Sequence, residues 1–181
     1  MNKRKAQIWV ETVIYTLVGI AIIAVALAII TPKINEFRDK AVIEQTINSL
    51  KAIDSRIDSV VSGGNGNVRI VEFRMKKGEF YVDKEKETIY YVLKESRSVY
   101  SEPGEKVNFG RIEIMTEKEE GSKNHKVSLT LNYSSFDIDF SSEEENPWKI
   151  FESTTPYKLR FENAGLNEEE KIKVLFDVVS G

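Results

Sequence analysis

The sequence predicts an α+β protein in which one long N-terminal α-helix precedes an antiparallel, β-sandwich-like domain. Residues 13–30 are apolar except for Thr16 and Gly19, and apolar residues then recur three and four apart as far as Val60. From Val68 onward apolar and polar residues alternate, which is the period of β-strands. Helix-forming and strand-forming stretches are therefore separated along the chain, as in α+β folds.

The apolar run is long enough to cross a membrane. Residues 13–30 rise about 27 Å as an α-helix, close to the thickness of the hydrocarbon core. The residues that follow the run mix basic with acidic side chains, whereas the residues that precede it are basic only: Lys3, Arg4 and Lys5. Because basic flanks stay in the cytoplasm, we expect a cytoplasmic N-terminus and an extracellular C-terminal bulk.

Three interpretations of this segment compete. A secretory signal peptide could be cut at Ala24-Val-Ala26 or Ala26-Leu-Ala28, but the run exceeds the usual ~7–15 apolar residues and Glu11 stands at its start. An uncleaved signal anchor explains the length and the orientation but gives Glu11 no role. In the third interpretation a short basic leader is removed, and the apolar stretch becomes the N-terminus of the mature chain.

The residues around that third cleavage point resemble a known family. Lys5-Ala6 followed by Gln7-Ile-Trp-Val-Glu11 and an apolar helix is similar to the class III signal peptide of archaeal type IV pilin-like proteins. The resemblance covers roughly residues 3–35. It implies that a membrane-embedded prepilin peptidase cuts between Ala6 and Gln7, that Glu11 is retained, and that the pilus assembly machinery is a partner.

Glu11 is the acid that the membrane segment must accommodate. A charged side chain costs about 2.5–3.5 kcal/mol at the centre of a bilayer and less near its interface. Cleavage before Gln7 would create an α-ammonium one turn from Glu11, where the helix dipole also favours negative charge. Pairing of Glu11 with the ammonium of an axially shifted neighbour would penalise subunits that are out of register. The alternative is an interfacial acid that reaches water and has no role.

The helix is expected to continue past the membrane. Pro32 removes one backbone hydrogen bond and is expected to kink the helix rather than end it. Gly63-Gly-Asn-Gly66 is expected to end it, which gives residues 7–61 as one helix of about 80 Å. Its second half carries an apolar stripe: Ile34, Phe37, Ala41, Val42, Ile43, Ile47, Leu50, Ile53, Ile57 and Val60.

The two halves of this helix suit different packing partners. The amphipathic half is expected to pack on its own C-terminal domain, and the apolar half on the helices of other subunits once it leaves the lipid. Gly19 and the nearby alanines would allow a close approach of helices. A membrane anchor followed by a stalk would fit the same periodicity.

Eight short strands are predicted in the C-terminal domain. They are expected at residues 68–75, 80–82, 88–93, 111–116, 127–133, 136–140, 157–162 and 171–179. Turn sequences such as Lys77-Gly78 and Pro103-Gly104 separate several of them. Strands of this number and length favour an antiparallel sandwich or barrel.

Composition narrows the possible functions. The chain has no cysteine, and its one histidine, His125, lies in a polar stretch that reads as a solvated turn, so no metal site is expected. Residues 67–181 contain 18 basic and 23 acidic residues, a net charge of −5, which argues against nucleic-acid binding. Because no catalytic or phosphate-binding motif is present either, we expect neither an enzyme nor a cofactor.

One modification site is suggested by the sequon Asn132-Tyr-Ser134. In the strand expected at residues 127–133, Asn132 falls on the polar face, so its side chain should point to solvent. By the topology argument this face is extracellular, and Asn132 could therefore carry an N-linked glycan.

Together these observations predict a basic leader (1–6), an N-terminal helix (7–62) and an extracellular β-rich domain (67–181). The hypothesis is a type IV pilin-like subunit of a surface filament used for adhesion. It would be a single-pass membrane precursor that is processed by prepilin peptidase and polymerises with copies of itself through the N-terminal helix. The alternative hypothesis is a membrane-anchored extracellular β-domain that acts as a binding module.

Overall fold

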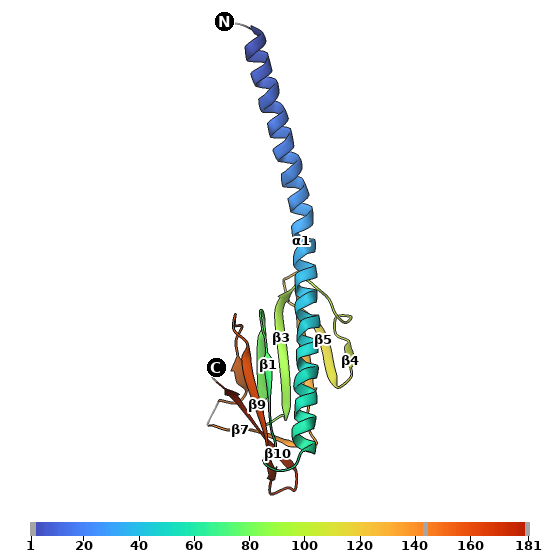
Figure 1. Cartoon of the computed structure of the whole chain (residues 1–181). Coiled ribbons are helices and arrows are strands. Elements are labelled where there is room, and N and C mark those ends of the chain that lie inside the picture. The colour runs from blue at the N-terminus through green and yellow to red at the C-terminus, as the bar shows by residue number, and fades with distance from the viewer. Residues whose placement is uncertain (1–2, 143–144, 180–181) are drawn as a thin grey trace. The chain divides into compact units, whose positions relative to one another are not determined.

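The predicted α+β fold is confirmed. The structure, a computed structural model, describes residues 3–142 and 145–179, with side chains from Trp9 onward. The chain forms two compact units, an N-terminal unit (Met1–Arg38) and a head unit (Asp39–Gly181). A single helix, α1 (Lys3–Ser62), runs from the first unit into the second, and strands follow it (Figure 1).

Helix α1 ends where the glycine-rich sequence predicts. It continues through Pro32 and stops at Ser62, after which Gly64 adopts a φ of 80°, a conformation that a glycine adopts without steric cost. The amide of the buried Asn163 donates to the Val60 carbonyl oxygen at 3.3 Å, so a side chain from a distant strand satisfies one of the last helical carbonyls.

The buried stripe of α1 is shorter than the sequence predicts. Its buried apolar members are Ile43, Ile47, Leu50, Ile53, Ile57 and Val60. Ile34 and Phe37 are exposed instead, at 44% and 69% of their surface, and Ala41 is exposed as well. Within the head unit the prediction was wrong for Ala41, because helical spacing shows which face is apolar but not which residues of that face a sheet covers.

The described residues contain ten strands in two sheets. The four-stranded sheet has the order β1 (Val68–Phe73), β9 (Tyr157–Leu166), β10 (Ile172–Val179), β7 (Asp137–Phe140). The six-stranded sheet has the order β4 (Lys106–Phe109), β5 (Ile112–Lys118), β6 (His125–Asn132), β3 (Thr88–Ser96), β2 (Glu79–Asp83), β8 (Trp148–Ile150).

One strand pair departs from the antiparallel prediction. β7 and β10 are parallel, with Val174 opposite Ile138, whereas the other pairs are antiparallel. The first sheet is therefore mixed. Alternation of apolar residues shows that a segment is a strand, but it carries no information on strand direction, so the sequence could not reveal this pair.

Two strands, β4 and β8, were not predicted, and the prediction for His125 was wrong. β4 is exposed along its whole length and β8 has three residues, so neither shows a buried face long enough to give a period of two. His125 is the first residue of β6 and partly buried, rather than part of a solvated turn. Its Nδ1 atom is buried without a hydrogen-bond partner among the described residues.

The two sheets and α1 share one core. The Trp148 ring of β8 lies 4.9 Å from the Phe176 ring of β10, and the Phe73 ring of β1 lies 4.7 Å from the Phe80 ring of β2. Each of these contacts joins one sheet to the other, while the buried stripe of α1 belongs to the same apolar cluster. The head unit therefore has a core of its own.

Candidate functional site

The outstanding surface of the N-terminal unit is an apolar helix without a covering partner. Every described residue from Trp9 to Ile30 is exposed except Gly19, which is half-exposed. Leu17 and Ile22 expose 59% and 64% of their surface. Within the described part of the chain this is the one helix whose length and composition would let it cross a membrane. Apolar surface on this scale marks a contact with lipid or with other proteins.

Two threonine hydroxyls, one within this segment and one directly after it, donate hydrogen bonds to the backbone of the helix itself. The Thr16 hydroxyl donates to the Thr12 carbonyl oxygen at 2.8 Å, and the Thr31 hydroxyl donates to the Leu27 carbonyl oxygen at 2.7 Å. Such bonds let threonine enter an apolar environment without an unpaired donor. Thr16 and Thr31 therefore do not present unpaired hydroxyl donors to an apolar environment.

Glu11 lies in α1 one turn after Gln7 and is exposed. Two aromatic residues flank it, Trp9 and Tyr15, which expose 71% and 75% of their surface. Tryptophan and tyrosine favour the interface between membrane and water, so this end of the segment suits that depth. Glu11 is thus placed where an acid costs less than at the bilayer centre.

The predicted cleavage site precedes these residues. The backbone of Lys3, Arg4, Lys5, Ala6 and Gln7 belongs to α1, but their side chains lie outside the described residues. The basic leader and the cut between Ala6 and Gln7 therefore stay predictions.

Charged residues reappear directly after the apolar segment. Lys33 and Glu36 form an exposed ion pair at 2.8 Å, just past Pro32. Pro32 lies within the helix, and the kink expected there stays a prediction. The apolar surface is thus bounded by Pro32 and this ion pair on its C-terminal side.

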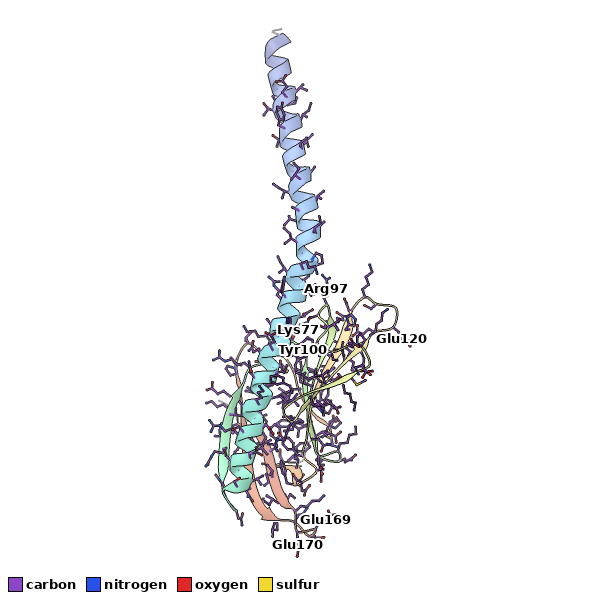
Figure 2. The ribbon with its side chains drawn as sticks, turned by 90° about the vertical axis from the view of Figure 1, so that its right-hand side faces the viewer. Lys77, Arg97, Tyr100, Glu120, Glu169 and Glu170 are labelled. Carbon is purple, nitrogen blue, oxygen red and sulfur yellow. The ribbon has the colours of Figure 1, made fainter. Side chains whose placement is uncertain are left out.

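The first residue of the head unit is a buried acid that the sequence did not single out. Asp39 is 6% exposed, and its carboxylate accepts from the Lys77 ammonium at 2.7 Å and from the Arg97 backbone N–H at 2.9 Å. Lys77 lies in the β1–β2 loop and Arg97 follows β3, and Figure 2 shows both residues beside the helix. Asp39 therefore holds the β1–β2 loop and the segment after β3 against α1. An acid within an apolar stripe was the available signal.

A second cluster lies on the outer face of the six-stranded sheet. Glu79 pairs with Lys94 at 2.9 Å and with Lys149 at 2.5 Å, and it accepts from the Tyr81 hydroxyl at 2.9 Å. The hydrogen bonds from Lys149 and Lys94 lower the pKa of Glu79 from its ordinary 4.5 to about 2, against the opposing effect of burial. Tyr81 stacks on Tyr90 of β3 with 4.8 Å between ring centroids. These ion pairs and the stacked rings connect β2, β3 and β8 on the outer face of the sheet.

Asn132 is exposed at the end of β6, and its Oδ1 atom accepts from the Ser134 backbone N–H at 3.0 Å. It borders a hollow of about 330 Å³ that Arg111 and Thr130 also line. Arg111 in turn pairs with Asp54 and Asp58 of α1, which anchors this edge of the sheet to the helix. The glycan at Asn132 stays a prediction.

The described residues were also compared with the requirements of a metal site. Among the described residues no group of three or more His, Asp and Glu side chains is placed to hold a metal ion. Comparisons with family models, with curated proteins and with solved structures return no match. The architecture itself, a long exposed apolar helix followed by two β-sheets, is type IV pilin-like.

Proposed function

We propose that this chain is a type IV pilin-like subunit of an extracellular surface filament used for attachment. The subunit has a structural role, without catalysis or a cofactor. One observation carries the proposal: a helix that exposes its apolar residues from Trp9 to Ile30 is joined to a head unit with its own buried core. Localisation changes with assembly, from a membrane precursor with a cytoplasmic N-terminus to a filament at the cell surface.

The energetics explain why the helix needs two successive environments. Burial of one large aliphatic side chain contributes about 1.5–3 kcal/mol, and the segment exposes many of them. Water is therefore an unfavourable solvent for the isolated chain. Lipid can cover the helix before assembly, and the helices of neighbouring copies can cover it in the filament, which satisfies the same surface in both states.

Gly19 supports packing between helices. A Cβ atom added at Gly19 would meet no other atom within 4 Å, so nothing within the described chain requires a glycine there. Glycine inside a helix costs about 0.5–1 kcal/mol relative to alanine. A neighbouring helix that packs closely against Gly19 would gain contacts that offset this cost.

Glu11 is proposed to set the axial register. After cleavage the ammonium of Gln7 in a neighbouring subunit would be its partner, and a misaligned subunit would leave a charge unpaired in an apolar environment. The sequence places no other acid between Glu11 and Pro32, so alternative pairings within that stretch are absent.

The test replaces Glu11 with glutamine in cells that carry a filament assembly system. Glu11→Gln keeps the size and removes the charge, so we expect filament yield to fall at least about tenfold while the membrane-bound precursor still accumulates. Glu36→Gln is the matched control, because Glu36 forms an exposed ion pair with Lys33 outside the apolar segment. Normal filaments from Glu11→Gln would show that the acid does not set the register.

A further inference from the structure

Two surfaces at opposite ends of the head unit are complementary in charge. The first is a hollow of about 500 Å³ lined by Arg74, Lys76, Glu152, Ser153 and Thr154, here named the basic hollow. The second is the turn between β9 and β10, residues 167–170, here named the acidic turn, which carries Glu168, Glu169 and Glu170. All three glutamates are exposed.

Strand register fixes the separation of the two surfaces. Phe73, the last residue of β1, pairs with Tyr157, the first residue of β9, so Arg74 and Lys76 lie near the start of β9. The acidic turn follows Leu166, the last residue of β9. A strand of ten residues is about 30 Å long. Figure 2 shows the same arrangement, with Lys77 at one end of the head unit and Glu169 and Glu170 at the other.

The cations of the basic hollow are available. Arg74 and Lys76 are exposed and alternate with the buried Phe73 and Met75, so they point away from the core. Neither makes an ion pair with a described residue. The hollow also has one acid, Glu152, and the Ser153 backbone N–H donates to the Met75 carbonyl oxygen at 3.0 Å, which holds the two sides of the hollow together.

The acidic turn is held in a fixed shape. The Oδ1 atom of Asn167 accepts from the backbone N–H groups of Glu169 and Lys171, both at 2.9 Å, and the Asn167 N–H donates to the Lys171 carbonyl oxygen at 2.8 Å. Within the chain Lys171 approaches Glu169 at 3.6 Å. The turn therefore presents its carboxylates with little loss of backbone entropy on binding.

Apolar residues accompany both surfaces. Leu166 stands beside the acidic turn with 68% of its surface exposed. Phe151, which is 60% exposed, lines a second hollow that shares Glu152 with the basic hollow. A contact that buries one apolar pair within a rim of opposite charges has the composition of a specific interface.

From these observations, and resting on the proposed function, we infer that the acidic turn of one subunit binds in the basic hollow of the next copy of the chain. The contact joins two different surfaces of the same protein, so it is heterologous and can repeat without closing, as a filament requires. It would add a head-to-head contact to the packing of the helices, and its charges would favour one order of subunits along the filament.

The test reverses the charges on each side in cells that assemble the filament. The hollow variant is Arg74→Glu/Lys76→Glu, and the turn variant is Glu168→Lys/Glu169→Lys/Glu170→Lys. We expect each to lower filament yield about tenfold, because like charges would then face each other. The matched control, Lys118→Glu/Lys123→Glu, reverses two exposed cations elsewhere on the head unit and should assemble normally.

Two rescue experiments make the pairing specific. A chain that carries both sets of reversals should assemble, and so should a mixture of the hollow variant with the turn variant, since each then offers the other an opposite charge. Retained head-unit unfolding temperatures show that the variants fold.

Wild-type yield from either variant alone, or loss of assembly without rescue, would overturn the head-to-head contact while the pilin-like role stands. Reduced attachment to an anionic surface by the hollow variant at normal filament yield would also overturn it, and would assign the hollow to an external polyanion. Failure of the wild-type chain to form filaments would instead refute the proposed function together with the contact.

Discussion

Glu79 illustrates how single residues stabilise the outer face of the head unit. Its carboxylate is held between Lys94 and Lys149, and the side chain of Glu79 is 22% exposed, so the pair is partly shielded from water. The lysine hydrogen bonds lower the pKa of Glu79 from 4.5 to about 2. Because the folded-state pKa is depressed, the resulting stability is present above pH 4.5 and is lost as the pH falls toward 2.

Glu79→Gln should therefore reduce the acid sensitivity of the head unit. Screening by solvent limits the expected loss near neutral pH to about 1–2 kcal/mol, and the variant should lose less additional stability than the wild type between pH 4.5 and 2. Thermal unfolding of the full chain in a neutral detergent, followed by circular dichroism at several pH values, measures this difference. Glu113→Gln, which removes one exposed pair with Lys106, is the control. Parallel pH profiles for Glu79→Gln and the wild type would exclude the ion-pair network as the cause.

At the same scale, the sequence revealed the exposed residues better than the buried polar ones. The exposure of Asn132 and the burial of Val127, Leu129 and Leu131 follow from strand alternation and are confirmed. The burial of Asp39 and Asn163 was not predicted, because their partners lie far along the chain and a polar residue in a helix or strand is more often solvated. The prediction for His125 was wrong because a polar residue in a polar stretch of sequence is more often solvated.

The helix is the element for which sequence reasoning succeeded most fully. Period and glycine content predicted an end near residue 62 and continuation through Pro32, both of which the structure has. The sheets were predicted less completely. The pairing order, the parallel β7–β10 pair and the short strands β4 and β8 depend on tertiary contacts that no local pattern encodes.

One substitution made at two places on α1 separates its two roles. Leu50 is fully buried in the head unit, so Leu50→Ala should lower the free energy of unfolding by about 2–5 kcal/mol. Leu17 is 59% exposed, and Leu17→Ala should leave head-unit unfolding unchanged. Denaturant unfolding of the full chain in detergent, monitored by the β-sheet signal, compares the two. Equal losses for both variants would mean that the N-terminal segment contributes to the stability of the head unit.

On the scale of the whole molecule, the chain combines two units that suit different environments. The head unit buries its own core, whereas the N-terminal unit exposes apolar residues that water does not accommodate. This contrast was predictable because composition changes abruptly along the sequence. The basic hollow and the acidic turn could not be predicted from the sequence in the same way. They are far apart in sequence, and the register of β1 with β9 is what places them at opposite ends of the head unit.

The intact mass of the protein isolated from the cell surface tests the central claim most directly. Processing as a pilin-like subunit predicts a mature chain that starts at Gln7, lacks Met1–Ala6 and is recovered in filaments sheared from the cells. A glycan at Asn132 would add to the measured mass. The variant Asn132→Gln lacks the sequon, so its mass reports the cleavage site alone. A full-length chain, or one that starts after Ala26 or Ala28, would contradict the account and favour a membrane-anchored or secreted β-domain.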